Sequence, residues 1–176
     1  MKKIFFIFLL IYSGVSSAIV YNEWEDKDRN IAQLISINAC MGCFLNGTNF
    51  QNTNFTNANL PGADLVTSNL SGVILTNANL EGSSLFGANL EGSSLEKANL
   101  YGANLYGANL YGANLSNANM YGAELSKSNL SQTNLSYADL TNANLRGALI
   151  DGAKFNGVIL CNTTMPSGKI INSSCN

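Results

Sequence analysis

The sequence predicts an all-β solenoid, a chain wound into stacked coils, and three observations lead to this fold class. A large apolar residue, usually leucine, stands at every fifth position from Leu45 to Leu160, which makes 24 consecutive centres. A small residue stands two places before nearly every centre, and asparagine or aspartate stands directly before 16 of the 24. The pattern extends over residues 43–162, so it decides the architecture of most of the chain.

A period of five suits neither regular element. Five residues of an α-helix advance about 500°, so successive leucines would form no apolar stripe. In a continuous β-strand an odd spacing sends every second leucine to the opposite face. The chain must therefore turn a corner once per repeat, so that every fifth side chain points toward one common axis.

The remaining repeat positions agree with such a winding. Fourteen alanines occupy the position two before a centre, and a large and a small side chain per repeat can fill a narrow interior without overpacking. Asn59 and Asp64 are examples of the residue directly before a centre, where short polar side chains favour turns. Gly62 and Gly82 are examples of glycine two places after a centre. We therefore expect one turn in every repeat.

Runs such as Ala103-Asn104-Leu105-Tyr106-Gly107 resemble the A(D/N)LxG consensus of the pentapeptide-repeat family. The resemblance spans residues 43–162 and implies a right-handed quadrilateral β-helix with four repeats per coil. Twenty-four repeats would then make six coils, and their stack would be roughly 29 Å long at the usual ladder spacing. Residues 20 apart would lie on the same face.

Residues 1–18 have the features of a signal peptide. Two lysines follow Met1, an apolar run extends from Ile4 to Tyr12, and Ser16-Ser17-Ala18 matches a cleavage site. We expect cleavage after Ala18 and export to the periplasm or the extracellular medium. The apolar run is too short to span about 30 Å of hydrocarbon, so stable membrane insertion is not expected.

Segments without the repeat flank residues 43–162 and are interpreted as caps. Residues 19–42 carry Trp24, Ile31, Leu34 and Ile35 at helical spacing, which predicts a helix that covers the open first coil. Recruitment of a partner by this helix is the alternative. Residues 163–176 contain the run Thr164-Met165-Pro166-Ser167-Gly168, which resembles the TMPDG ending of exported pentapeptide-repeat proteins, and they are predicted to cap the other end.

Four cysteines lie in two groups, Cys40 with Cys43 before the repeats and Cys161 with Cys175 at the end. Three pairings exist formally. The six coils that the resemblance implies would separate the groups by far more than the roughly 7 Å that a disulfide can bridge between Cα atoms. This leaves pairing within each group, which an oxidising compartment favours, and it excludes one zinc ion bound by all four thiolates. A redox role for the CxxC pair stays open as an alternative.

The sequence lacks several of the residues and motifs that catalysis usually requires. The chain contains no histidine, so the most frequent general base and nitrogen metal ligand are missing. No phosphate-binding or dinucleotide-binding glycine motif occurs, because the glycines recur with the turns. We therefore expect a protein that is not an enzyme and binds no cofactor or metal.

Aromatic residues directly after a centre are the most individual surface feature. The family geometry would direct these side chains outward and stack those that are 20 apart. They combine apolar area with a polar group, so they could bind a partner, but stacked rings could equally serve only to stabilise the coils. The candidate binding face consists of Phe86, Tyr101, Tyr106, Tyr111 and Tyr121.

The sequence thus predicts a secreted structural or interaction module whose partner is an unidentified protein, a carbohydrate or a second copy. Some pentapeptide-repeat proteins instead inhibit or protect topoisomerases such as gyrase by imitating DNA. Residues 43–162 carry seven acids and four bases, a net charge of −3. Duplex DNA of the same length carries roughly 17 charges, so we keep DNA mimicry as the alternative and expect no nucleic-acid partner.

Overall fold

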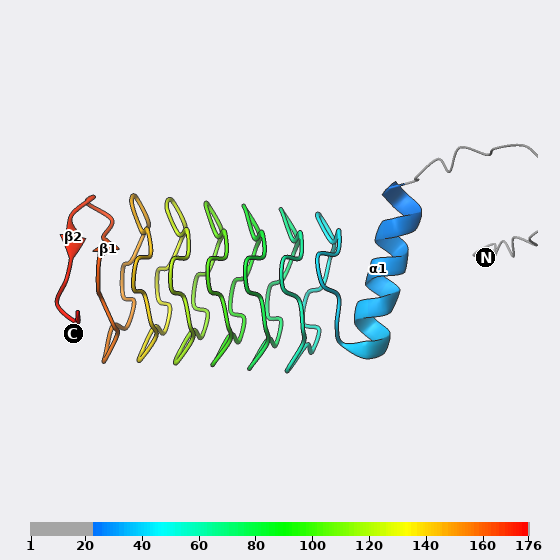
Figure 1. Ribbon diagram of the computed structural model, residues 1–176, viewed down its shortest axis with the longest axis horizontal. Coiled ribbons are helices and arrows are strands. Elements are labelled where there is room, and N and C mark those ends of the chain that lie inside the picture. Colours follow the sequence, from blue (N-terminus) through cyan, green and yellow to red (C-terminus); the bar gives the residue numbers. More distant parts are fainter. Residues whose placement is uncertain (1–22, 176) are drawn as a thin grey trace, which may run out of the picture.

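The structure, a computed structural model, describes residues 23–175. The described chain forms helix α1 (Glu23–Ile37), then a long stack of coils, and then a small antiparallel pair of strands, β1 (Thr163–Thr164) and β2 (Ile170–Ile171). Figure 1 shows α1 at one end of the stack and the β1–β2 hairpin at the other. The predicted signal peptide, residues 1–18, lies outside the described residues.

The coils are joined by parallel β-bridges that always connect residues 20 apart. These bridges run from the pair Ala39–Asn59 to the pair Asn144–Thr164. Twenty residues hold four repeats of five, so each coil has four sides, as the resemblance implied. Each bridge is one residue long on each side, because the chain turns a corner before a longer strand can form. The prediction of an all-β solenoid is confirmed.

The five backbone N–H groups of one repeat are hydrogen-bonded in four different ways. In repeat 78–82, Ala78 donates within its own corner at 3.0 Å, and Asn79 donates to the preceding coil at 2.8 Å. Leu80 and Gly82 donate to the following coil at 2.7 and 2.9 Å. The N–H of Glu81 has a side-chain acceptor, the Oδ1 of Asn79, at 3.2 Å. All five donors are therefore paired.

The core is a column of centres and small residues along the axis of the stack. Leu80 and Leu100 are fully buried, as are Ala78 and Ala98 beside them. Burial is less complete in the last coil, where centres such as Phe155 are only partly covered. Large and small residues alternate inward as predicted.

At each corner, the residue two places after the centre adopts the left-handed backbone conformation, with a positive φ. Glycine supplies most of these positions, for example Gly62 with a φ of 66°. Asparagine supplies several others, such as Asn77 with a φ of 57°, because its short polar side chain tolerates this region. Tyr137, with a φ of 61°, occupies the same position although a bulky residue is disfavoured there.

Helix α1 packs against the first coil. Leu34 is buried in the main core and Ile31 packs against it, as the sequence predicts. Lys27 donates to a backbone carbonyl of the first coil. Ile35, although part of the predicted apolar pattern, is 67% exposed, and the side chain of Trp24 lies outside the described part. The function of this helix as a cap stays a prediction.

The cysteines form the two expected pairs. Cys40 and Cys43 are bridged with a Cα separation of 5.5 Å. Cys161 and Cys175 are bridged with a Cα separation of 4.8 Å, which ties the segment after β2 to the last coil. Disulfides of this kind indicate an oxidising environment. Within residues 23–175 no helix is long and apolar enough to cross a membrane.

Buried hydroxyls give a first test of this fold. Ser68 and Ser83 both point into the core and are fully buried, but only Ser68 has an acceptor, the carbonyl of Leu45 at 2.8 Å. Because an unpaired buried hydroxyl costs about 1–3 kcal/mol, Ser83→Ala should stabilise the protein by about 1 kcal/mol and Ser68→Ala should destabilise it similarly. Thermal or denaturant unfolding measures both. Equal shifts in the two variants would contradict the assignment.

The C-terminal disulfide gives a second test. The Cys161–Cys175 bridge closes a loop with a sequence separation of 14. Its removal in a double serine variant should lower the free energy of unfolding by about 3 kcal/mol, because the unfolded chain gains conformational freedom. Denaturant titration of oxidised wild type, reduced wild type and the variant measures this loss. If the reduced wild type unfolded at the same concentration as the oxidised protein, the bridge would have no stabilising role.

Candidate functional site

The five aromatic residues predicted as a binding face lie on three successive corners of the coils. Tyr101 and Tyr121 are 20 apart and share one corner, and Phe86 and Tyr106 share the next. Tyr111 stands on the third corner. The aromatic residues therefore wrap around the rod, and only neighbouring corners can contact one ligand together.

Both expected stacks are present. The ring centroids of Tyr101 and Tyr121 are 5.2 Å apart with an interplanar angle of 6°. Those of Phe86 and Tyr106 are 5.4 Å apart with an angle of 2°. Lys127 places its ammonium 5.3 Å from the centre of the Tyr106 ring. Tyr101 remains 47% exposed, so stacking leaves much of this ring open to a partner.

The side of the rod between these two stacks carries Glu124. Burial alone would raise the pKa of Glu124, but hydrogen bonds from the side chain of Ser126, from Asn144 and from the backbone of Ser126 outweigh it and lower the pKa. Asn144 donates to Oε2 at 2.8 Å, and Ser126 donates to Oε1 from both its backbone N–H and its hydroxyl. This carboxylate is therefore held ionised by fixed donors, which does not suit a general acid.

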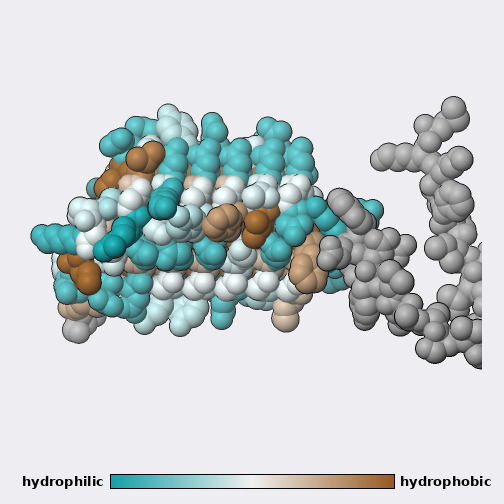
Figure 2. Space-filling view, turned by 90° about the horizontal axis from the view of Figure 1, so that it is seen from above, coloured by the Kyte–Doolittle hydropathy of each residue, from teal (hydrophilic) through white to brown (hydrophobic). Residues whose placement is uncertain are grey.

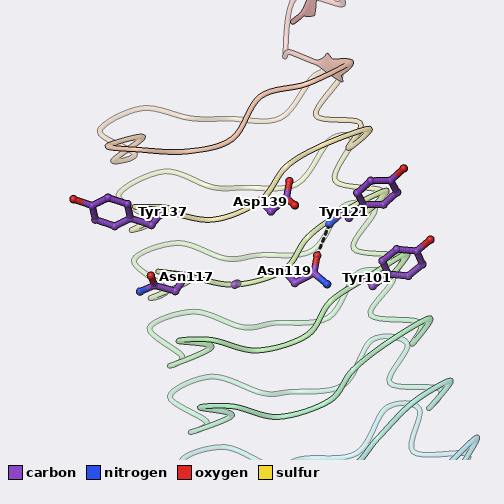
Figure 3. A pocket seen from close by; sticks show the side chains of 7 residues that line it. Tyr101, Asn117, Asn119, Tyr121, Tyr137 and Asp139 are labelled. Atoms are coloured by element: carbon purple, nitrogen blue, oxygen red, sulfur yellow. Dashed lines mark hydrogen bonds between the residues drawn. The ribbon is translucent and has the colours of Figure 1, made fainter. Parts of the chain in front are cut away.

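A shallow hollow of about 320 Å³ lies on the adjoining side, beyond the Tyr101–Tyr121 corner. Figure 3 shows Tyr101 and Tyr121 along one edge and Tyr137 along the opposite edge, with Asn119 and Asp139 between them. The aromatic rings point away from one another, so the hollow is a broad open surface. We name it the Tyr137 hollow; its lining is Tyr101, Asn117, Ala118, Asn119, Tyr121, Tyr137 and Asp139.

Sequence reasoning missed Tyr137. It occupies the turn position where glycine or asparagine is usual, not the position directly after a centre, and it is 66% exposed. Its ring lies over the next coil at Gly157, where an added Cβ would come within 2.5 Å of a ring carbon. A tyrosine at a turn position that requires positive φ was a signal available in the sequence.

The CxxC pair is poorly placed for redox exchange. Cys40 is fully buried and Cys43 is 7% exposed. Attack on a disulfide requires access to a sulfur atom, so this geometry favours a structural bridge. Within residues 23–175, no three or more acidic, cysteine or histidine side chains are grouped so that they could hold a metal ion.

The face of the rod seen in Figure 2 carries polar rows that follow the coil spacing. Figure 2 shows hydrophilic residues in lines along the rod, with a few hydrophobic patches, one of them near the C-terminal end. Leu149, Ile159 and Ile170 are the exposed apolar residues of that end. The Tyr137 hollow differs from these rows because aromatic rings flank a polar floor.

Comparisons with known proteins agree with the repeat pattern. The profile of the family described as pentapeptide repeats matches in eight copies, at residues 42–72, 68–100, 98–136 and 128–165. No match was found among the curated proteins.

Three similar solved structures illustrate the range of relatives. A pentapeptide repeat protein from the cyanobacterium Cyanothece is 33% identical over 74% of this chain and 97% of its own, with a TM-score of 0.47. A pentapeptide repeat protein from the Arabidopsis thaliana thylakoid lumen is 25% identical over 73% and 69%, with a TM-score of 0.36. QnrB1, a plasmid-mediated fluoroquinolone resistance protein, is 18% identical over 72% and 78%, with a TM-score of 0.30.

The profile matches cover well over half of the chain, and they coincide with the coils joined by β-bridges. The chain belongs to the pentapeptide-repeat family.

Proposed function

We propose that this protein is an exported, non-enzymatic binding module that holds its partner at the Tyr101–Tyr121 corner. The observation that carries the proposal is the stack of Tyr101, 47% exposed, on the partly exposed Tyr121, on a rigid scaffold. Tyrosines are enriched in interfaces because they provide apolar area and a hydrogen-bonding group with little loss of conformational entropy. The partner is a protein in this proposal.

Rigidity supports the proposal, because a preorganised surface loses little entropy on binding. The backbone of each coil is hydrogen-bonded to the coils on both sides, and the stacked rings are held at the spacing of the coils. Helix α1 and the β1–β2 hairpin would cover the two ends and prevent the rods from joining end to end.

Export is part of the proposal. The two disulfides suit an oxidising compartment, and residues 1–18 have the pattern of a signal peptide. Cleavage after Ala18 would leave seven basic and 11 acidic residues, a net charge of −4. This mild negative charge favours basic partners, but it is several-fold below the charge density of DNA, so we prefer a binding module to a DNA mimic.

Replacing both stacked tyrosines tests the proposal. Tyr101→Ser with Tyr121→Ser should greatly weaken capture of the partner from the native compartment, because the exposed aromatic area at this corner is lost. Loss of the stack should lower stability by only about 0.5–1.5 kcal/mol, so the rod stays folded. Affinity capture followed by mass spectrometry measures the first effect, and thermal unfolding the second.

Tyr111→Ser is the matched control, because it removes a ring of similar exposure (44%) from a different corner. Capture by this variant should equal that of the wild type. If the double variant captured the same proteins as the wild type and only its stability fell, the stacked tyrosines would be stabilising elements and the proposed binding corner would be wrong.

A further inference from the structure

The floor of the Tyr137 hollow is the end of a ladder of side-chain amides. Asn79, Asn99 and Asn119 each donate from Nδ2 to the Oδ1 of the asparagine one coil earlier, at 3.0–3.1 Å. The Oδ1 atoms of Asn79 and Asn99 also accept a backbone N–H from their own corner, each at 3.2 Å. Inside the ladder, each amide oxygen is therefore paired twice.

Asp139 stands where the next asparagine of the ladder would be, and a carboxylate has no N–H to donate. Within residues 23–175, the Oδ1 of Asn119 consequently accepts only the backbone N–H of Tyr121, at 3.2 Å. Asp139 Oδ1 accepts the backbone N–H of Thr141 at 2.9 Å. No described residue donates a hydrogen bond to Asp139 Oδ2. The lining of the hollow thus offers a singly paired oxygen on Asn119 and an unpaired oxygen on Asp139, on consecutive coils.

The other acids in bridged positions do not share this deficit. Asp64 receives a hydrogen bond from the Nδ2 of Asn46 at 3.3 Å. Glu124 receives one from Asn144 at 2.8 Å and another from the hydroxyl of Ser126. Among the bridged carboxylates of the described chain, Asp139 is the one without a side-chain donor. The unpaired Oδ2 therefore distinguishes Asp139 from the other two bridged acids, whereas a singly paired Oδ1 like that of Asn119 also occurs at Asn104 and Asn129.

A primary ammonium group would satisfy this arrangement. It brings three N–H donors and a positive charge. A sugar hydroxyl could donate one hydrogen bond but would leave the carboxylate charge uncompensated. An arginine guanidinium would also compensate the charge, but the two acceptors lie on different residues of consecutive coils, which does not match its parallel bidentate fork. Lys97, at the same corner as Tyr137 but two coils earlier, has its ammonium 3.7 Å from the carboxylate of Glu96.

We propose that the Tyr137 hollow receives a lysine side chain of a partner polypeptide. Its ammonium donates to Asp139 Oδ2 and Asn119 Oδ1, and its apolar stem lies against the tyrosine at the edge. The size of the hollow, about 320 Å³, is at the lower end of the range for ligand sites and suits one side chain. This inference rests on the proposed function and names the chemical group that the partner presents.

Asp139→Asn is the decisive variant, because it replaces the carboxylate by the residue that the ladder contains elsewhere. The new amide can donate to Asn119 Oδ1, so the variant should keep or raise the melting temperature. Binding of a fluorescent tetralysine peptide, measured by anisotropy at low salt, should weaken about tenfold or more, the change that corresponds to about 1.4 kcal/mol.

Glu124→Gln is the matched control, because it removes the same charge from an acid that already has its donors. Its affinity for tetralysine should stay within about twofold of the wild type, a change of under 0.5 kcal/mol. The peptide acetylated on its lysines should not bind. Equal weakening in both variants, binding of the acetylated peptide, absence of wild-type binding, or binding of a glucosamine oligomer in place of tetralysine would each overturn the inference.

Partner capture separates this inference from the function on which it rests. Asp139→Asn and the Tyr101/Tyr121 double variant should both lose the partner. If Asp139→Asn kept the partner and the double tyrosine variant lost it, the lysine site would be wrong and the binding corner would stand. If both variants kept the partner, the binding corner would be wrong as well.

Discussion

The pairing of backbone N–H groups between coils is the constraint on which the rest of this structure depends. A chain that turns a corner every five residues can pair three of its five N–H groups with neighbouring coils and one within the corner. The fifth, directly after the centre, points to no carbonyl and is satisfied by the side chain of the residue before the centre, as Glu81 is by Asn79. The preference for asparagine or aspartate at that position therefore follows from the need to pair this backbone N–H and not only from turn propensity.

Because these requirements apply within each repeat, they explain what could be predicted from the sequence. The period of five, the inward pair of large and small residues, and the left-handed turn position are each properties of one repeat, so they can be read without knowing its neighbours. The two disulfide pairs needed only the additional expectation that the coils keep the cysteine groups apart. The stacks of Tyr101 on Tyr121 and Phe86 on Tyr106 followed from the spacing of 20 residues per coil.

The features that were missed depend on how side chains meet across coils. The turn position of Tyr137 can be read from the sequence, but the contact of its ring with Gly157 on the next coil cannot. In the sequence, Asp139 is only one of the asparagine or aspartate residues directly before a centre. Its importance comes from Asn119, 20 residues earlier, which adds a second acceptor beside it. Ser83 matched the requirement for a small inward residue, yet it lacks the acceptor that Ser68 has. A repeat consensus records residue types but not these pairings.

This separation between scaffold and pairing lets the family fold, a right-handed quadrilateral β-helix, acquire a site with very small changes. Asparagine and aspartate both accept the backbone N–H two residues ahead, so exchanging them preserves the corner, as Asn119 and Asp139 demonstrate. The exchange replaces one amino group by an oxygen, which ends the side-chain ladder and leaves two acceptors at the surface. A solenoid can thus place a charged recognition group on any side of the rod without altering its core, and the tyrosines at neighbouring corners determine where such a group is flanked by aromatic rings.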